Sequence, residues 1–193
     1  PMLGWVLDAA EQYGFDRIAV VTGYKREQTE DYIAKRGGNT EVFFQPEQKG
    51  TGDAAACAME LIRDCDFTCI LNGDAPFIDA RTIADSLSCM KARGASAAVI
   101  SAKIADPAGY GRIIRENGSF TAIREQKDCS PEEREICEVN SGAYWFDSRL
   151  LAQALPKLSA NNAAGEYYLT DCIELIGNAA AYESENPDIV LGA

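Results

Sequence analysis

The alternation of short apolar runs with amphipathic segments is the feature that most limits how this chain can fold. Residues 17–23, "RIAVVTG", form a β-branched run that ends in glycine, which is typical of a buried strand. Further strands are predicted at 41–45, 66–74 and 95–102, and helices between them at 2–13, 24–36, 53–63 and 79–92. Strands that alternate with helices in this way predict a mostly parallel sheet with helices on both faces.

The pattern changes after residue 105. "GRIIREN", "GSFTAIREQ" and "VNSGAYWFD" are predicted strands, and the short helix at "SPEEREI" should begin with a capping box formed by Ser130 and Glu133. Two helices follow, at 147–157 and from "GEYYLTDCIELI", and "ENPDIVLGA" (185–193) is predicted to be a strand. We expect residues 1–193 to form a single domain, with an α/β half (1–104) and a mixed α+β half (105–193).

Composition excludes several classes of function. The net charge of −12 argues against a nucleic-acid partner, which needs a basic face, although a nucleotide could still be held locally. No apolar run approaches the ~18 residues of a membrane span, so no membrane partner is expected. The absence of histidine removes Ser-His-Asp triads and histidine-based zinc sites. The seven cysteines include no C-x-x-C pair, and we interpret them as reduced thiols of a cytoplasmic protein.

Asp74 follows the predicted strand 66–74 in "CILNGDAPF", beside a glycine and just before a proline turn. In open α/β sheets, ligands bind beyond the carboxyl ends of the strands. A carboxylate there suits Mg²⁺, which takes one or two carboxylates together with substrate phosphates. The alternative is a turn residue that caps the following loop.

Residues 45–54, "QPEQKGTGDA", join a predicted strand to a predicted helix. They could form a phosphate-binding turn, a base pocket or only a tight turn. The match to G-x-G-x-x-A is weak, because Asp53 stands near the helix start and is expected to occupy the amides that a pyrophosphate would need. An uncharged base against the glycines stays open, with Gln45 and Thr51 offering donors and acceptors.

Three further candidates lie in the second half. Gly111 in "GYGRI" would let a bulky ligand approach the backbone. Glu125 and Asn140 lie at strand ends or inside strands, where a polar side chain usually belongs to a solvated face. Taken singly, none of the three indicates a site.

Together, six short motifs resemble the sugar-nucleotide pyrophosphorylase family. Within it, they resemble the uridylyltransferase domain of the bacterial bifunctional N-acetylglucosamine-1-phosphate uridylyltransferase/glucosamine-1-phosphate acetyltransferases. The motifs are "QPEQKGTGDA", "LNGDAP", "DPAGYGRIIREN", "IREQKD", "EVNSGAYWFD" and "NAAGEYYLTD". The resemblance runs from residue 1 to residue 193. It implies a Rossmann-like, glycosyltransferase-A-like nucleotidyltransferase fold, with a mixed, mostly parallel sheet flanked by helices and a smaller α+β sugar-binding part.

The resemblance also implies roles for matching positions. Gln45 would hydrogen-bond uracil, with Gly50 and Thr51 packed around the base. Asp74 would be the catalytic Mg²⁺ ligand. Two residues would line the nucleotide site beside it, Asn72 and Gly73, although family members often have tyrosine at the first. The sugar and its phosphate would be held by Gly111, Glu125, Asn140, Tyr168 and Thr170.

The implied reaction is attack of N-acetylglucosamine 1-phosphate on the α-phosphorus of UTP, which gives UDP-N-acetylglucosamine and pyrophosphate. Its implied setting is the cytoplasmic synthesis of peptidoglycan and lipopolysaccharide precursors. Such a transfer needs positioning and charge neutralisation more than a proton-transfer base, so the lack of histidine is compatible with it.

Two departures from the family pattern lead to further expectations. The family places a strand, a glycine-rich loop and a lysine before the helix matched by 2–13, and an asparagine metal ligand after "LGA"; residues 1–193 contain neither. We therefore expect a gap in the middle of the sheet and little or no uridylyltransferase activity from this chain alone. We also expect a monomer, because resembling proteins trimerise largely through a β-helix acetyltransferase domain.

Three alternatives stay open. The first is the same reaction with another sugar or nucleotide, which pocket contacts would decide. The second is an NAD-dependent Rossmann protein, which rests only on the G-x-G-x-x-A match. The third is a sugar-nucleotide-binding fragment without catalysis.

Overall fold

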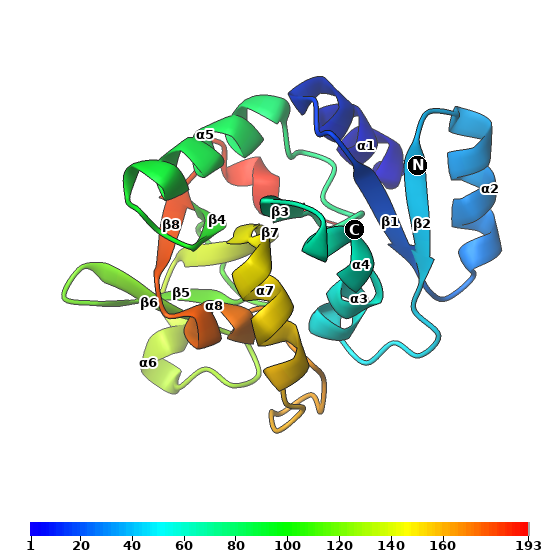
Figure 1. The fold of residues 1–193 in the computed structure, drawn as a ribbon. Coiled ribbons are helices and arrows are strands. Elements are labelled where there is room, and N and C mark those ends of the chain that lie inside the picture. Colours follow the sequence, from blue (N-terminus) through cyan, green and yellow to red (C-terminus); the bar gives the residue numbers. More distant parts are fainter. Residues whose placement is uncertain (193) are drawn as a thin grey trace.

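The computed structural model describes residues 1–192, and Ala193, the last residue of the predicted strand 185–193, lies outside them. Helices and strands alternate through the first half, and strands are mixed with short helices in the second (Figure 1). The elements, in chain order, are α1 (Met2–Tyr13), β1 (Ile18–Thr22), α2 (Arg26–Arg36), β2 (Thr40–Phe44), α3 (Thr51–Cys57), α4 (Met59–Arg63), β3 (Phe67–Ile70), α5 (Ala80–Ala92), β4 (Ala97–Lys103), β5 (Arg112–Glu116), β6 (Ser119–Arg124), α6 (Pro131–Arg134), β7 (Glu138–Asp147), α7 (Ser148–Ala154), η1 (Leu155–Lys157), α8 (Asp171–Ile176), β8 (Ala179–Glu183) and η2 (Pro187–Val190). None of these helices is both long and apolar enough to cross a bilayer.

The strands form two sheets. β1 and β2 pair in parallel, while the larger sheet has the order β6-β5-β7-β4-β8, with β3 also paired to β7. In Figure 1 the small sheet lies between α2 and the rest of the molecule. The predicted fold class, a mixed α/β sheet flanked by helices, is confirmed.

The expectation of a mostly parallel sheet is wrong for the larger sheet, where most neighbouring strands are antiparallel because of strand β7. It pairs antiparallel with β4 along one edge and with β3 and β5 along the other, so it lies between β3 and β4. β3, β4 and β8 still run in the same direction. The alternation in the first half predicted the common direction of β3 and β4, but it could not reveal that a strand from the second half inserts between them.

Two apolar clusters cover the two faces of the larger sheet. In β4, Ala97 and Val99 belong to one cluster, whereas Ala98 and Ile100 belong to the other. Helices α3, α4, α7 and α8 contribute to the first cluster, and α1 and α5 to the second. Because successive side chains of a strand point to opposite faces, a strand buried on both faces is apolar throughout. This burial accounts for the continuous "AAVISA" run.

The expected gap is present between β1 and β3, which do not pair with each other. A cavity of about 820 Å³ lies there, lined on its two sides by residues 18–21 of β1 and residues 67–70 of β3. Its other walls come from α1, α3 and α4, and its far end is formed by loops and by β7. The cavity therefore joins the small sheet to the carboxyl end of β3.

Several local predictions need correction. The predicted helix 53–63 is two helices, α3 and α4, separated at Ala58. The predicted strand 66–74 ends at Ile70, because residues 72–75 form a turn in which the Ala75 amide donates to the Asn72 carbonyl. The predicted capping box at Ser130 is confirmed.

The end of the chain was predicted wrongly. Residues 187–190 form the 3-10 helix η2, whose first turn suits Pro187, and Asn186 caps it by accepting from the Asp188 amide. The sequence interpretation missed β8, which pairs in parallel with β4. The alanine-rich segment "AAAYE" has little intrinsic strand preference, so burial against β4 decides its conformation.

Candidate functional site

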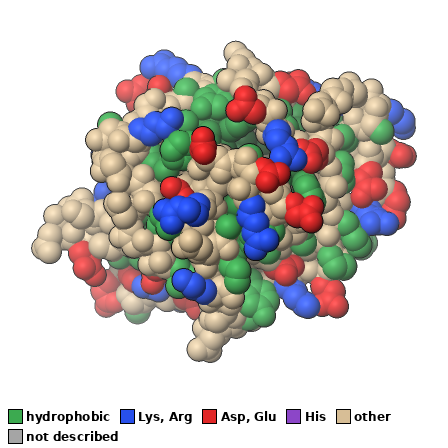
Figure 2. Space-filling model, in the orientation of Figure 1, with side chains coloured by type: hydrophobic (Ala, Val, Ile, Leu, Met, Phe, Trp, Pro, Cys, Tyr) green, Lys and Arg blue, Asp and Glu red, His purple; other side chains and the backbone are tan. Residues whose placement is uncertain are grey.

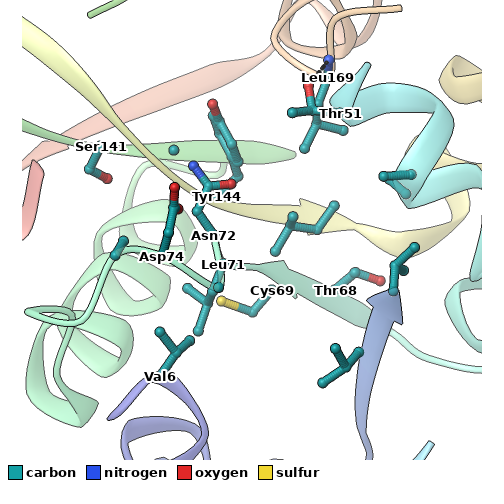
Figure 3. A pocket seen from close by; sticks show the side chains of 18 of the residues that line it. Val6, Thr51, Thr68, Cys69, Leu71, Asn72, Asp74, Ser141, Tyr144 and Leu169 are labelled. Atoms are coloured by element: carbon teal, nitrogen blue, oxygen red, sulfur yellow. Dashed lines mark hydrogen bonds between the residues drawn. The ribbon is translucent and has the colours of Figure 1, made fainter. Parts of the chain in front are cut away.

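The cavity brings together predicted site residues from segments far apart in the sequence. They come from the start of α3, the turn after β3, and the loops and strands of the second half. Figure 3 shows Asn72, Asp74 and Tyr144 around the same space. The predicted residues that line it are Thr51, Asn72, Gly73, Asp74, Gly111, Glu125, Asn140 and Thr170. Gln45, Gly50 and Tyr168 lie outside its lining. Gly50 and Tyr168 are next in sequence to Thr51 and Leu169, which line it, and Gln45 is hydrogen-bonded to Gly50.

The "KGTG" turn is hydrogen-bonded to the "EYYLT" segment. The Gly52 amide donates to the Tyr167 carbonyl (2.8 Å), and the Leu169 amide donates to Thr51 Oγ1 (3.0 Å). Gly50 has φ +111°, and a Cβ added there would lie 2.6 Å from the Tyr167 carbonyl oxygen. Close backbone packing thus accounts for the glycines. The Gly52 amide is already bonded and is unavailable to a pyrophosphate.

Asp53 does not have the role that its position predicts. Helix α3 begins after Gly50 without any side-chain cap, so the Asp53 carboxylate does not occupy the helix amides. It accepts instead from Gln45 Nε2 at 2.7 Å, and the same amide nitrogen donates to the Gly50 carbonyl at 3.2 Å. Gln45 and the glycine turn therefore form one hydrogen-bonded unit beside Thr51.

Asp74 lies exposed in the turn after β3, at the carboxyl end of that strand. Among residues 1–192, its carboxylate forms no ion pair and no side-chain hydrogen bond. The chain end approaches it: a Cβ added at Gly192 would lie 3.2 Å from the Asp74 carbonyl oxygen and 3.8 Å from Oδ2. Asp74 is thus an uncompensated carboxylate at the cavity.

The donor set around Asp74 limits which metal it could hold. In the described part of the chain, no three His, Cys, Asp or Glu side chains are grouped so that they could hold a metal. Zinc and calcium sites built by protein ligands are therefore not supported there. One carboxylate with open positions fits Mg²⁺, which keeps waters and takes substrate phosphates as ligands.

A bulge in β7 positions Asn140. Ile100 of β4 pairs with Ala143 and the next residue, Ser101, pairs with Asn140, so two residues of β7 are extra. Gly142 supplies the left-handed conformation that the bulge needs (φ +78°). The Ser141 hydroxyl donates to the Ile100 carbonyl at 2.7 Å, which satisfies the interrupted ladder.

The Asn140 side chain is held on both sides. Its Nδ2 donates to the Tyr144 hydroxyl at 2.6 Å, and its Oδ1 accepts from the Gly142 amide at 2.9 Å. Burial raises the pKa of Tyr144, so the phenol stays neutral. Asn72 lies against the same bulge, since a methyl group at Gly142 would collide with the Asn72 amide.

Glu125 faces the neighbouring wall. Its Oε1 accepts from the Thr170 hydroxyl at 3.1 Å, and a Cβ added at the buried Gly111 would lie 3.3 Å from its Oε2. Burial raises the pKa of Glu125, against the opposing effect of the Thr170 hydrogen bond. The Gly111 carbonyl accepts from the Asn140 amide at 2.9 Å, so Gly111, Glu125 and Asn140 share one corner of the cavity. Burial raises the pKa of Tyr168, and the negative charges of Asp128 and Glu125 add to this effect.

The sequence interpretation missed three residues of this site: Asp53 as the partner of Gln45, and Ser141 and Tyr144 beside Asn140. Tyr144 stands on the same side of β7 as Asn140 because the bulge adds an even number of residues, which leaves the alternation of side chains unchanged. The Asn-Ser-Gly sequence inside an apolar strand was the available signal, since glycine there often marks a bulge.

Charged side chains of both signs are intermixed over the face seen in Figure 2. Basic residues do not gather there into a continuous surface, as a nucleic-acid partner would require.

Comparison with known proteins identifies similar sequences. Residues 1–164 match the sequence family described as the MobA-like NTP transferase domain. The bifunctional protein GlmU of Acetivibrio thermocellus is 40% identical over 198 aligned residues, which cover 100% of this chain and 42% of that protein. The GlmU of Geobacillus thermodenitrificans is 39% identical, again over 100% of this chain and 42% of the relative. The chain thus spans about two fifths of the length of these relatives, and the matches confirm the resemblance that the motifs indicate.

A solved structure shares the fold. The crystal structure of a Bacillus anthracis protein designated a glucose-1-phosphate thymidylyltransferase, in complex with a sucrose, superimposes with a TM-score of 0.77. The alignment covers 96% of this chain and 74% of that one at 19% identity. At this identity the match concerns the fold alone.

Proposed function

The chain belongs to the MobA-like NTP transferase family and is a nucleotidyltransferase domain, and on this premise we propose that it forms the uridylyltransferase part of an enzyme that makes UDP-N-acetylglucosamine. Its substrates are UTP and N-acetylglucosamine 1-phosphate, and pyrophosphate is the second product. One observation carries the proposal. The uncompensated Asp74 carboxylate lines the same cavity as the corner formed by Gly111, Glu125 and Asn140. The similarity to GlmU proteins supports the choice of sugar and nucleotide.

In this proposal the two substrates meet near Asp74. The base binds beside Gln45, Gly50 and Thr51, and Asn72 and Gly73 line the path of the phosphates. Asp74 holds Mg²⁺, which when bound neutralises phosphate charge.

The sugar binds in the corner of Gly111, Glu125 and Asn140. Gly111 lacks a side chain, so a pyranose ring can approach the backbone. The Glu125 Oε2 and Asn140 amide atoms are fixed by Thr170 and Tyr144, so they can hydrogen-bond sugar hydroxyls or the acetamido group without further ordering. Thr170, with the adjacent Tyr168, completes this side.

In this proposal the residues of the cavity act by positioning the two substrates. A phosphate monoester loses its second proton near pH 6, so the attacking oxygen needs no base at neutral pH. The fixed side chains hold the two substrates in line, which lowers the entropic part of the barrier. We further propose that this reaction supplies cell-wall precursors in the cytoplasm and that this piece of chain is monomeric.

The test is binding of UDP-N-acetylglucosamine, measured by calorimetry with and without Mg²⁺. We expect the substitution Asp74→Asn to weaken Mg²⁺-dependent binding at least about tenfold and to leave metal-free binding unchanged, because only the metal ligand is lost. Asp31→Asn, at an exposed position of α2 outside the cavity lining, is the matched control.

The same preparations are assayed for pyrophosphate release from UTP and the sugar phosphate. We expect little release from this chain alone, and whatever release is measured should require Mg²⁺ and fall at least about a hundredfold in the Asp74→Asn variant, the size of effect seen when one electrostatic contact to a reacting group is lost. Binding without release would support a non-catalytic fragment. Stabilisation by NAD, with no effect of any uridine nucleotide, would contradict the proposal.

A further inference from the structure

Gln45 is held rigidly at the end of the small sheet. Its amide donates to the Thr22 carbonyl at 2.8 Å, which extends the β1–β2 pairing by one residue, and its carbonyl accepts from Gln48 Nε2 at 3.4 Å. Only 7% of its surface is exposed. The backbone of Gln45 is therefore fixed, and the direction of its side-chain amide depends on its immediate neighbours.

Those neighbours determine which of the two amide positions is occupied by Nε2 and which by Oε1. Both hydrogens of Gln45 Nε2 have acceptors, namely Asp53 Oδ2 at 2.7 Å and the Gly50 carbonyl at 3.2 Å. Neither acceptor can donate, so an inverted amide would place its carbonyl oxygen against two other oxygens. Among the described residues, Gln45 Oε1 has no hydrogen-bond partner. It is not completely buried either. It is accordingly free to accept from a ligand.

We propose that Asp53 is a specificity-determining residue: by fixing the Gln45 amide it makes the base pocket accept a keto pyrimidine and reject cytosine. This inference rests on the proposed function, in which Gln45 faces the base. A uracil or thymine ring donates from N3–H and can bond to Oε1. Cytosine presents a lone pair at N3, which the same oxygen repels.

A glutamine without Asp53 would not discriminate in this way. Rotation of its amide by half a turn exchanges donor and acceptor, so it could match either base. The Gly50 carbonyl alone holds Nε2 by the longer bond, whereas the bond to the carboxylate is charge-assisted and shorter. The preference for one amide orientation is thus expected to come mainly from Asp53.

The substitution Asp53→Asn tests this with almost no change in shape. An asparagine amide can either donate or accept, so it permits both orientations of Gln45. Binding of UTP and of CTP to the chain is measured by calorimetry in the presence of Mg²⁺. We expect the unsubstituted chain to prefer UTP at least about tenfold, the factor that one hydrogen bond can supply, and the variant to bind both within about threefold.

Two controls and one replacement variant accompany this test. Asp31→Asn should keep the UTP preference, and the melting temperature of Asp53→Asn without nucleotide should match that of the unsubstituted chain. If Asp53→Asn does not fold, Asp53→Ser replaces it, because a hydroxyl also donates and accepts.

The possible results distinguish failure of the inference from failure of the proposed function. An Asp53→Asn variant that retains the full UTP preference overturns the inference and leaves the proposed function intact. An unsubstituted chain that binds UTP and CTP equally also overturns the inference alone. A chain that binds no uridine nucleotide overturns the proposed function, and the inference with it.

Discussion

At the scale of single residues, Gly50 is fixed by sterics and conformation together. Its backbone has φ 111° and ψ 175°, and an added Cβ would meet the Tyr167 carbonyl oxygen at 2.6 Å and amide nitrogen at 2.9 Å. These are backbone atoms, so the collision cannot be relieved by a side-chain rotation. We expect Gly50→Ala to lower the free energy of unfolding by roughly 3 kcal/mol, measured by urea denaturation.

Gly37 provides the matched control for this prediction. It has a similar backbone conformation, with φ 76° and ψ −166°, but an added Cβ would meet nothing within 4 Å. Gly37→Ala should therefore cost only the conformational part, about 1 kcal/mol. Equal losses in the two variants would show that contact with Tyr167 contributes nothing.

How far the sequence predicts single residues depends on what determines their position. Asp74 could be placed near a strand end from local pattern alone, and the structure has it in the turn after β3, at the cavity. The partner of Gln45 could not be found in this way, because Asp53 satisfies the local rule for a helix cap equally well. The choice between those two roles depends on how the segment after β2 folds back, which local sequence does not specify.

At the scale of elements, Glu138 joins three strands. From β7 it accepts from Ser101 of β4 at 2.8 Å, and its carboxylate pairs with Arg115 of β5 at 2.7 Å. Burial by itself would raise the pKa of Glu138, but the hydrogen bonds from Arg115 and Ser101 and the nearby positive charges outweigh it, so the pKa is lowered. The charged carboxylate therefore stabilises the sheet.

This arrangement predicts a pH dependence. Because the pKa is lower in the folded chain, the stabilisation is complete above the unfolded-state pKa and is lost as the pH falls through the folded-state value. We expect Glu138→Gln to cost roughly 2 kcal/mol at pH 7, since it leaves Arg115 without its partner. Urea denaturation from pH 7 down to about pH 3 should show the two stability curves converging below about pH 4.5. A constant difference at every pH would contradict this explanation.

The elements differ in how well they could be predicted. α1 and α5 have an apolar face, β4 is a long apolar run and α2 ends at a glycine, and the structure has all four where predicted. β8 and η2 were missed because tertiary contacts outweigh weak local preference. The break at Ala58 likewise has no local sequence signal that we can identify.

At the scale of the whole molecule, the β1–β2 sheet is bound less firmly than the larger sheet. β1 pairs on one edge only and its residues 18–21 are half-buried, whereas Ala97–Ile100 of β4 are fully buried and paired on both sides. Regions with fewer buried contacts open at a lower free energy. We expect amide hydrogens of β1 and β2 to exchange with an opening free energy at least about 2 kcal/mol below that of β4 and β7.

Hydrogen exchange followed by mass spectrometry measures this directly. Peptides that cover residues 17–24 and 40–46 are compared with peptides that cover 96–103 and 138–147. Equal protection in both sets would mean that the two sheets open as one unit. The relation between the sheets is also what local sequence predicts least, because it depends on the cavity between them rather than on either sheet.

The two-residue bulge in β7 has a consequence for how such a chain can change over generations. Because the insertion is even, the side chains before and after it stay in phase, so Val139 and Ala143 face the same cluster. Gain or loss of one residue within β7 would exchange the side chains that face the two clusters and turn Asn140 away from Tyr144. Length variation should therefore be tolerated in the exposed loop around residues 159–165 but not in β7. In β7, the pocket can be altered only by substitutions that keep the length of the strand.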